Sequence, residues 1–465
     1  MMKEMKKVLF VALTALLTAC GSTSRMARQQ ATPDSAHDPL VENVGGTSGG
    51  DVMSLLRDGD LFDNPSRTAG TSAPRHDAVA DAPSSRLATE LRQLIGAADT
   101  LFERSQLGLH VVDLTTAEVL YAYNAHQRMR PASTEKVATA VTALDLLGPG
   151  YALTTQILTT ASQTGSVLTG DIFIKGVMDP LLTTADVRSL ANQLRASGIR
   201  TVNGRLIVDA SFKDADEFGW GWCWDDDNPT LSPMLCGGKP VLADQLMAAL
   251  HAVGINVGRG TSTGTAPAAA TPVASVSHPL TAVLQPMMKE SDNLCAEAVF
   301  YHVAKAYAAY SSIRESGKSY SRKNGAAAVS AVINKSHLPA WGGREGISTV
   351  ADGSGLSLYN YQTPAAFTCL LAYATTQPER ILNPLMAALP MAGVDGTLKN
   401  RMAGTAAAKN VHAKTGSVSA VSTLVGYTTQ RSTGHLIAFA IMNQGVRSMA
   451  EARDFQDRVC RLLSE

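Results

Sequence analysis

The chain has 465 residues, of which 45% are hydrophobic, and this argues against one small, tight domain. The 40 Lys and Arg residues balance the 40 Asp and Glu residues, so no long-range field favours nucleic acid or an acidic membrane surface. The chain must therefore recognise its partner through a local site.

The N-terminus has the pattern of a targeting segment. Lysines precede an apolar run over residues 8–17, which is too short for a permanent membrane-spanning helix. The run ends in Leu17-Thr18-Ala19-Cys20-Gly21, which resembles a bacterial lipobox. We therefore expect residues 1–19 to be a lipoprotein signal peptide and Cys20 to become a diacylated N-terminus. The alternative is an ordinary secretory signal, which also exports the chain.

Gly21 follows the cysteine with no acidic residue beside it, which resembles lipoproteins sent to the outer membrane. We expect a lipid-anchored protein of the bacterial cell envelope, facing the periplasm, although the sequence leaves inner versus outer membrane open. Residues 20–85 are rich in small and polar residues without a periodic apolar face, and this composition predicts a flexible tether.

Export permits disulfides. Cys223 and Cys236 lie in one tryptophan-rich stretch and are the candidate pair, although the sequence leaves open whether they are bridged. Cys295, Cys369 and Cys460 lie among apolar residues, as buried thiols usually do. No cysteine spacing resembles a zinc site, and we expect neither metal nor cofactor.

The pattern from residue 86 onward predicts a helix and then a hairpin of strands over 107–114 and 119–123. A further helix is predicted to start at Ser133 and to end before Gly148. From residue 151 to 272 the sequence pattern changes and predicts short strands, such as 171–175 and 205–209, and a helix over 184–197. We expect an inserted α+β domain over 151–272.

Helical patterns return over 280–288 and 293–308, and Asp352-Gly353-Ser354-Gly355 predicts a tight turn. One strand is predicted over 410–421, two more over 423–428 and 436–442, and a last helix over 450–463.

Three short motifs occur in order: Ser133-Thr134-Glu135-Lys136, Ser291-Asp292-Asn293 and Lys414-Thr415-Gly416. Each alone is weak, because such residues usually lie on a solvated surface. In this order and context they match the S-x-x-K, S-D-N and K-T-G set of the penicillin-recognising serine acyltransferases.

The first motif supplies a nucleophile and its base. Ser133 stands where a helix begins, so backbone N–H groups and the positive end of the helix dipole favour an alkoxide there. Lys136 lies one turn later on the same face and can accept the serine proton if burial and a neighbouring cation, Lys414, depress its pKa. Taken alone, Ser133 would be a helix cap and Lys136 a surface lysine.

The other motifs supply the rest of the site. Ser291 is expected to relay a proton between Lys136 and the leaving amine and Asn293 to hold the substrate amide, although Ser-Asp-Asn also fits an N-cap of the following helix. On the strand edge, Lys414 and Thr415 are expected to recognise a terminal carboxylate, and Gly416 lets the backbone approach closely. The backbone N–H groups of Ser133 and Ser417 are expected to form the oxyanion hole. His412 is not taken as a base, because no partner Asp completes a triad.

Residues 86–465 resemble the D-alanyl-D-alanine carboxypeptidase/endopeptidase branch of low-molecular-mass penicillin-binding proteins, which has an insert between the first two motifs. The resemblance includes Gly170-Asp171-Ile172-Phe173-Ile174-Lys175-Gly176, Asn203-Gly204-Arg205-Leu206-Ile207-Val208-Asp209, Asp352-Gly353-Ser354-Gly355-Leu356-Ser357 and Asp395-Gly396-Thr397-Leu398. It implies an α+β transpeptidase-like fold of the penicillin-binding protein/β-lactamase type, an antiparallel sheet covered by helices, formed by 86–150 and 273–465. The interval from Ser133 to Ser291 is too short for the two inserts of larger relatives, so one smaller inserted domain is expected.

The resemblance implies a serine D-Ala-D-Ala carboxypeptidase or D,D-endopeptidase that acts on peptidoglycan stem peptides and is acylated by β-lactams on Ser133. The alternatives are a serine β-lactamase, against which the insert argues, and an inactive envelope-binding module, which would be expected to lack a motif residue. The balance of carboxypeptidase and endopeptidase action, the role of the insert and the oligomeric state stay open.

Overall fold

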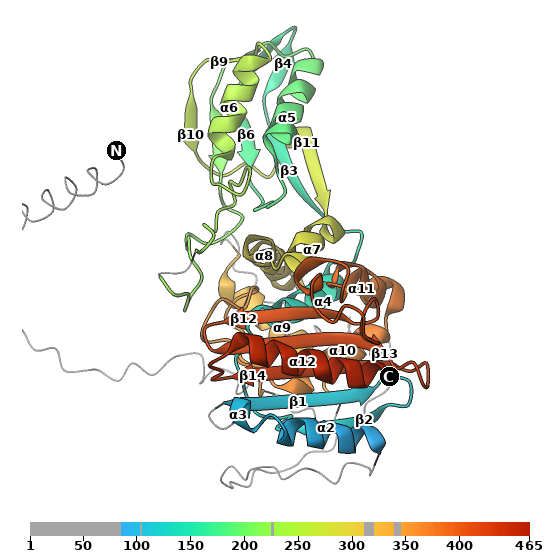
Figure 1. Ribbon diagram of the computed structural model, residues 1–465. Coiled ribbons are helices and arrows are strands. Elements are labelled where there is room, and N and C mark those ends of the chain that lie inside the picture. The colour runs from blue at the N-terminus through green and yellow to red at the C-terminus, as the bar shows by residue number, and fades with distance from the viewer. Residues whose placement is uncertain (1–84, 103–104, 225–226, 311–319, 339–345) are drawn as a thin grey trace, which may run out of the picture. The chain divides into compact units, whose positions relative to one another are not determined.

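The computed structural model describes residues 85–465 except 103–104, 225–226, 311–319 and 339–345. The predicted signal peptide, Cys20 and the predicted tether up to residue 84 therefore lie outside the described residues. The described chain is a mixed α+β protein, as the sequence predicts, and it contains three sheets (Figure 1). Within this part of the chain, no helix combines the length and the hydrophobicity that crossing a bilayer requires.

The main sheet is antiparallel, with strand order β12-β13-β14-β1-β2. The predicted N-terminal hairpin and the C-terminal strand pair are confirmed. The single strand predicted over 410–421 is wrong at its end, because Ala420, at φ 60°, turns the chain after Val418 and the next strand begins at Val421. The five strands are β1 (Gln106–Asp113), β2 (Glu118–Tyr123), β12 (His412–Val418), β13 (Val421–Thr429) and β14 (Leu436–Gln444).

Helices cover both faces of this sheet, because alternate residues of its strands are apolar on both sides. In β14, Ile437, Phe439 and Ile441 pack with α2 and α12, whereas Ala438 and Ala440 pack with the helices of the other face. The first face carries α2 (Arg86–Gly96) and α12 (Met449–Ser464), and the second carries α4 (Glu135–Leu146), α7 (Leu280–Lys289), α8 (Asn293–Tyr310), α9 (Arg322–Lys335), α10 (Pro364–Thr375) and α11 (Asn383–Ala388). Shorter elements are α3 (Asp99–Phe102), η1 (Ala132–Thr134), η3 (Pro378–Leu382) and η4 (Gly396–Leu398).

The segment between α4 and α7 forms the other two sheets, of order β10-β8-β6-β3-β11 and β4-β5-β7-β9. Two helices, α5 (Thr184–Ala196) and α6 (Leu242–Ala252), pack on them around one apolar cluster. The last strand, β11, pairs with β3 along its length and so continues past residue 272. The strands are β3 (Ala152–Thr159), β4 (Ser162–Thr164), β5 (Val167–Thr169), β6 (Ile172–Lys175), β7 (Thr201–Val202), β8 (Leu206–Asp209), β9 (Asn256–Val257), β10 (Thr261–Thr263) and β11 (Thr271–Pro279).

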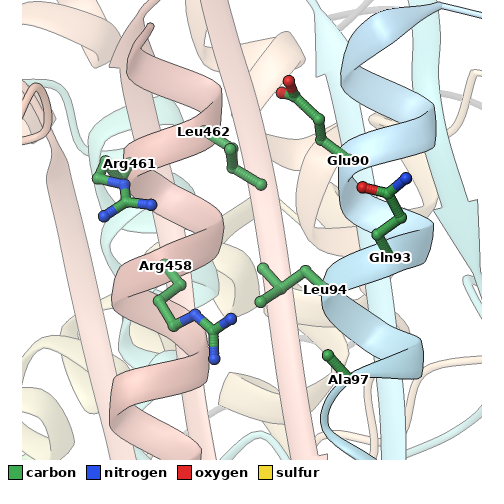
Figure 2. Close-up of a pocket in the computed structure, with 7 residues that line it drawn as sticks. All are labelled: Glu90, Gln93, Leu94, Ala97, Arg458, Arg461 and Leu462. Atoms are coloured by element: carbon green, nitrogen blue, oxygen red, sulfur yellow. The ribbon is translucent and has the colours of Figure 1, made fainter.

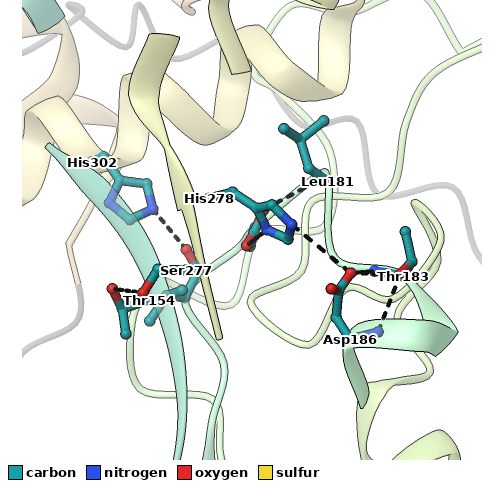
Figure 3. Close-up of polar contacts among 9 residues, drawn as sticks. Thr154, Leu181, Thr183, Asp186, Ser277, His278 and His302 are labelled. Carbon is teal, nitrogen blue, oxygen red and sulfur yellow. Dashed lines mark hydrogen bonds and ion pairs between the residues drawn. The ribbon is translucent and has the colours of Figure 1, made fainter. Parts of the chain in front are cut away.

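Two histidines make polar contacts with this segment, His278 from inside it and His302 from α8 (Figure 3). His278, on β11, lies 2.7 Å from Asp179 through Nδ1 and 3.8 Å from Asp186 through Nε2. His302, on α8, bonds through Nε2 to the carbonyl of Val177 at 2.8 Å. Burial lowers the pKa of His302 to about 3, so its ring is neutral and Nε2–H is the donor to that carbonyl.

Candidate active site

Ser133 lies in a 3-10 turn that leads directly into α4. The turn is η1, and α4 begins at Glu135, so the first turn of the predicted helix is 3-10 rather than α. The hydroxyls of Thr134 and Thr423 donate to the carbonyl of Pro131 at 2.6 and 2.7 Å, and these bonds tie the turn to β13. Ser133 is only partly buried, whereas Thr134, Glu135 and Lys136, which follow it, are buried.

Lys136 is buried directly behind this hydroxyl. Its Nζ lies 3.0 Å from Ser133 Oγ, 2.8 Å from Asn293 Oδ1 and 2.8 Å from the carbonyl of Ser354. A neutral amine satisfies this arrangement by donating two hydrogens to Asn293 and Ser354 and by accepting the hydroxyl hydrogen of Ser133.

Burial lowers the pKa of Lys136 to about 8, and nearby carboxylates, Asp352 foremost, oppose this shift. The sequence predicts that burial and the charge of Lys414 depress this pKa together. In the structure, burial is the main cause. The repulsion between the two lysines lowers the pKa of Lys414, which burial already depresses.

In the second motif, Ser291 and Asn293 are hydrogen-bonded to two different lysines. Ser291, at φ 64°, accepts from Lys414 Nζ at 2.9 Å, and Asn293 accepts from Lys136. Asp292 Oδ1 accepts from the backbone N–H of Cys295 at 2.8 Å near the start of α8. Asp292 therefore caps the start of α8, which agrees with the N-cap interpretation, and Ser291 and Asn293 are both hydrogen-bonded to lysines of the site.

The third motif lies on the edge strand β12. Lys414 is fully buried, and its Nζ also donates to the carbonyl of Thr415 at 2.8 Å. The Thr415 hydroxyl donates to that of Thr397 at 2.8 Å. Thr397 belongs to the Asp395-Gly396-Thr397-Leu398 segment, whose contact with the third motif no local pattern predicts.

Gly416 marks the point where β12 meets the nucleophile. A Cβ at this position would lie 2.7 Å from the carbonyl oxygen of Pro131 and 3.1 Å from the backbone nitrogen of Ser133. Only glycine fits without displacing this backbone, so the strand edge and the turn of Ser133 are in direct contact. Ser417 follows and is exposed.

The sequence predicts a tight turn over residues 352–355 but assigns it no role in the site. The turn delivers the Ser354 carbonyl to Lys136, and the backbone N–H groups of Gly353 and Ser354 donate to the buried Glu297 at 3.2 and 2.8 Å. Burial, with Asp352 nearby, raises the pKa of Glu297 to about 8. The Asp-Gly-Ser-Gly sequence signals the turn, but only the fold brings it to Lys136.

The cysteines have no covalent partners among the described residues. Cys223 and the buried Cys236 are both free thiols, so the structure does not contain the candidate disulfide. Cys295, Cys369 and Cys460 are buried, as predicted. Burial lowers the pKa of His412, which the sequence argument excludes as a base.

A separate hollow of about 270 Å³ lies between α2 and α12 (Figure 2). None of its lining residues belongs to the three motifs or to the turn over 352–355. They are Glu90, Gln93, Leu94, Ala97, Arg458, Arg461 and Leu462.

The sequence matches the D-Ala-D-Ala carboxypeptidase 3 (S13) family over residues 89–235 and 238–465. Carboxypeptidase DacB of Mycolicibacterium smegmatis is 31% identical, over 82% of this chain and 84% of that protein. D-alanyl-D-alanine carboxypeptidase DacB of Haemophilus influenzae is 27% identical, over 72% of this chain and 85% of that protein. The crystal structure of penicillin binding protein 4 from Haemophilus influenzae has a TM-score of 0.72 at 24% identity, covering 80% of this chain and 99% of that one.

These similarities confirm the predicted fold, a penicillin-binding protein fold with an additional domain. They also confirm the resemblance that the three motifs indicate, because the family match extends over most of the chain. The chain belongs to the D-Ala-D-Ala carboxypeptidase 3 (S13) family and is a hydrolase of the serine peptidase class.

Proposed function

We propose that this enzyme cleaves the D-Ala-D-Ala bond of peptidoglycan stem peptides through an acyl-enzyme on Ser133. The observation that carries the proposal is the 3.0 Å contact between Ser133 Oγ and the buried Nζ of Lys136. A serine hydroxyl beside an amine whose pKa is lowered to about 8 is an activated nucleophile and its base.

In the proposed acylation step, neutral Lys136 takes the Ser133 proton while Oγ attacks the carbonyl carbon of the penultimate D-Ala. The oxyanion is held by the backbone N–H groups of Ser133 and Ser417. Ser291, which accepts a hydrogen bond from Lys414, relays the proton that Lys136 has taken to the leaving amine, so that Lys136 is neutral again when the step ends. Water then releases the shortened peptide and regenerates Ser133.

Substrate binding is assigned to the groups that surround this centre. Asn293 holds the amide before the scissile bond, and Lys414 and Thr415 bind the terminal carboxylate, since a buried cation and a hydroxyl suit an anion. Gly416 allows the peptide to lie along the edge of β12. A β-lactam meets the same groups, and its opened ring stays on Ser133 as an ester.

We assign residues 86–150 and 273–465 to the peptidase domain and residues 151–272 to the inserted domain, with β11 leading from one to the other. Residues 1–19 are assigned as a signal peptide, residues 20–85 as a tether and Cys20 as the lipidated N-terminus. This places the enzyme in the cell envelope, lipid-anchored in the outer membrane and facing the periplasm.

The test uses the purified protein and its Ser133→Ala variant, each incubated with a fluorescent penicillin and followed by gel and mass spectrometry. We expect a stable adduct on Ser133 in the wild type and none in the variant, with both proteins folded by circular dichroism. Labelling of the variant would disprove the assigned nucleophile. Rapid drug hydrolysis without an adduct would indicate a β-lactamase, and neither adduct nor hydrolysis would favour a binding module.

A further inference from the structure

A loop of the segment between α4 and α7 reaches the turn over residues 352–355. The indole Nε1 of Trp222 donates to Asp352 Oδ2 at 2.7 Å, across 130 residues of sequence. The carbonyl of Gly221 accepts from the backbone N–H of Leu358 at 3.1 Å. The Trp220 ring stacks on Tyr359 with 4.2 Å between centroids, and the Arg322 guanidinium lies 5.1 Å from the Trp220 centroid.

Asp352 is fully buried and organises the whole turn. Its Oδ1 accepts from the backbone N–H of Gly355 at 2.8 Å and from Asn360 Nδ2 at 2.6 Å. Its Oδ2 accepts from the backbone N–H of Ser357 at 2.7 Å and from Trp222. A buried carboxylate needs such donors, and each lost donor leaves charge uncompensated in a low dielectric.

Two backbone carbonyls of this turn accept hydrogen bonds from α4, the helix that carries the base Lys136. The carbonyl of Ser354 accepts from Lys136 Nζ at 2.8 Å, and the Thr139 hydroxyl donates to the carbonyl of Gly353 at 2.8 Å. Three hydrogen bonds therefore lead from Trp222 to Lys136: from Trp222 to Asp352, from the Gly355 N–H to Asp352 and, across the Ser354–Gly355 peptide bond, from Lys136 to the Ser354 carbonyl. A shift of the Ser354 carbonyl would change the direction of the Lys136 lone pair relative to Ser133 Oγ.

We propose that Trp222 is a positioning residue, which acts through Asp352 and the Ser354 carbonyl to hold Lys136 in line with Ser133. This inference rests on the proposed function, because it assumes that Lys136 is the base for Ser133. It gives the inserted segment a role in the chemical step: the segment fixes the base through one indole hydrogen bond.

The test is the Trp222→Phe variant, which keeps a smaller aromatic ring and removes the indole N–H donor. The control is Trp224→Phe, the same change in the same loop at a side chain that is 93% exposed. Benzylpenicillin acylation is followed by stopped flow, which separates the dissociation constant of the encounter complex from the acylation rate constant at saturation.

We expect Trp222→Phe to lower the acylation rate constant about tenfold while the dissociation constant stays near the wild type, with a modestly lower melting temperature because the buried Asp352 loses a donor. Trp224→Phe should acylate at the wild-type rate. An unchanged rate constant in Trp222→Phe, or a weaker encounter complex at an unchanged rate, would overturn the inference, since the second result means that Trp222 contacts the ligand instead.

A second variant disrupts the same contact in another way. Gly221 has φ +77°, and a Cβ there would lie 2.7 Å from Ser357 Oγ, so Gly221→Ala displaces the loop from the turn. It should lower the same rate constant, and wild-type acylation by this variant would contradict the inference. Ser133→Ala is run alongside: labelling of that variant refutes the proposed function itself, whatever the Trp222 result.

Discussion

Two lysines are buried in the site, and their surroundings give them different tasks. Lys136 has acidic side chains near it, Asp352 foremost, which partly offset the cost of burying its charge. Lys414 is equally buried, and the neighbouring charge of Lys136 lowers its pKa further. Only Lys136 contacts Ser133 Oγ, so its titration should govern the chemical step.

This assignment predicts the pH dependence of acylation. A lysine is a base only when it is neutral, and burial lowers the pKa of Lys136 to about 8 from 10.5. The second-order rate constant for a β-lactam should therefore rise about tenfold per pH unit below pH 8 and level off above it. The measurement is acylation by a reporter β-lactam between pH 6 and pH 9.5.

A matched variant distinguishes the proton-accepting role of Lys136 from its positive charge. Lys136→Arg keeps a cation, but a guanidinium stays protonated throughout this range, so it should not acylate at any of these pH values. A wild-type profile that is flat from pH 6 to pH 9 would contradict the assignment of Lys136 as the titrating base.

At the scale of elements, the site depends on how closely β12 approaches η1. The register pairs Gly416 with Thr423 of β13, and Thr423 also donates to the carbonyl of Pro131 at 2.7 Å. Thr423 therefore links the turn before α4 to β13, which in turn pairs with β12. As a result, the Gly416 backbone lies against Ser133. A side chain at this position must separate the two elements.

Gly416→Ala should consequently reduce the acylation rate by about 100-fold or more, because the new Cβ would displace the strand edge from Ser133. The same fluorescent-penicillin assay measures the rate, and circular dichroism checks that the variant is folded. Gly150→Ala is the control, since nothing lies within 4 Å of a Cβ at that exposed turn. Equal rates for Gly416→Ala and wild type would show that the close approach is not required.

Several elements are predictable from local pattern, and the exceptions have physical causes. The hairpin of β1 and β2 and the helices α5 and α7 follow from periodicity that persists over several residues. The 3-10 form of η1 does not, because it depends on bonds from Thr423, far away in sequence, to Pro131. The end of β12 is not predictable from local pattern either, since nothing local marks Ala420 as the residue at positive φ.

At the scale of the whole molecule, the motifs supply the reacting side chains, and the fold supplies the groups that hold them. Ser133, Asn293 and Lys414 are recognisable from the sequence because their spacing within each motif is fixed. The partners of Lys136 lie 157 and 218 residues away, at Asn293 and Ser354. Local sequence carries no signal for the second of these contacts, nor for the bond between Trp222 and Asp352.

The remaining prediction concerns how the enzyme is held in the envelope. If Cys20 is acylated, cells supplied with an alkyne analogue of palmitate should yield labelled wild-type protein and unlabelled Cys20→Ser protein. Cys223→Ser is the matched control, because it removes another cysteine and should keep the label. The label is read after click coupling to a fluorophore, and mass spectrometry of the N-terminal peptide should place it on Cys20.

The opposite outcome has an equally definite meaning. An unlabelled wild type with a free N-terminus near residue 20 would identify an ordinary secretory signal, and the enzyme would then act without an acyl anchor.

Acylation would limit the enzyme's reach to the distance that the chain up to residue 85 can span from the lipid. A Gly- and Ser-rich chain of about 65 residues would have an average reach of about 40–50 Å. Peptidoglycan beyond that distance would be cleaved less often by the anchored enzyme than by the Cys20→Ser form, provided that this form is exported and released.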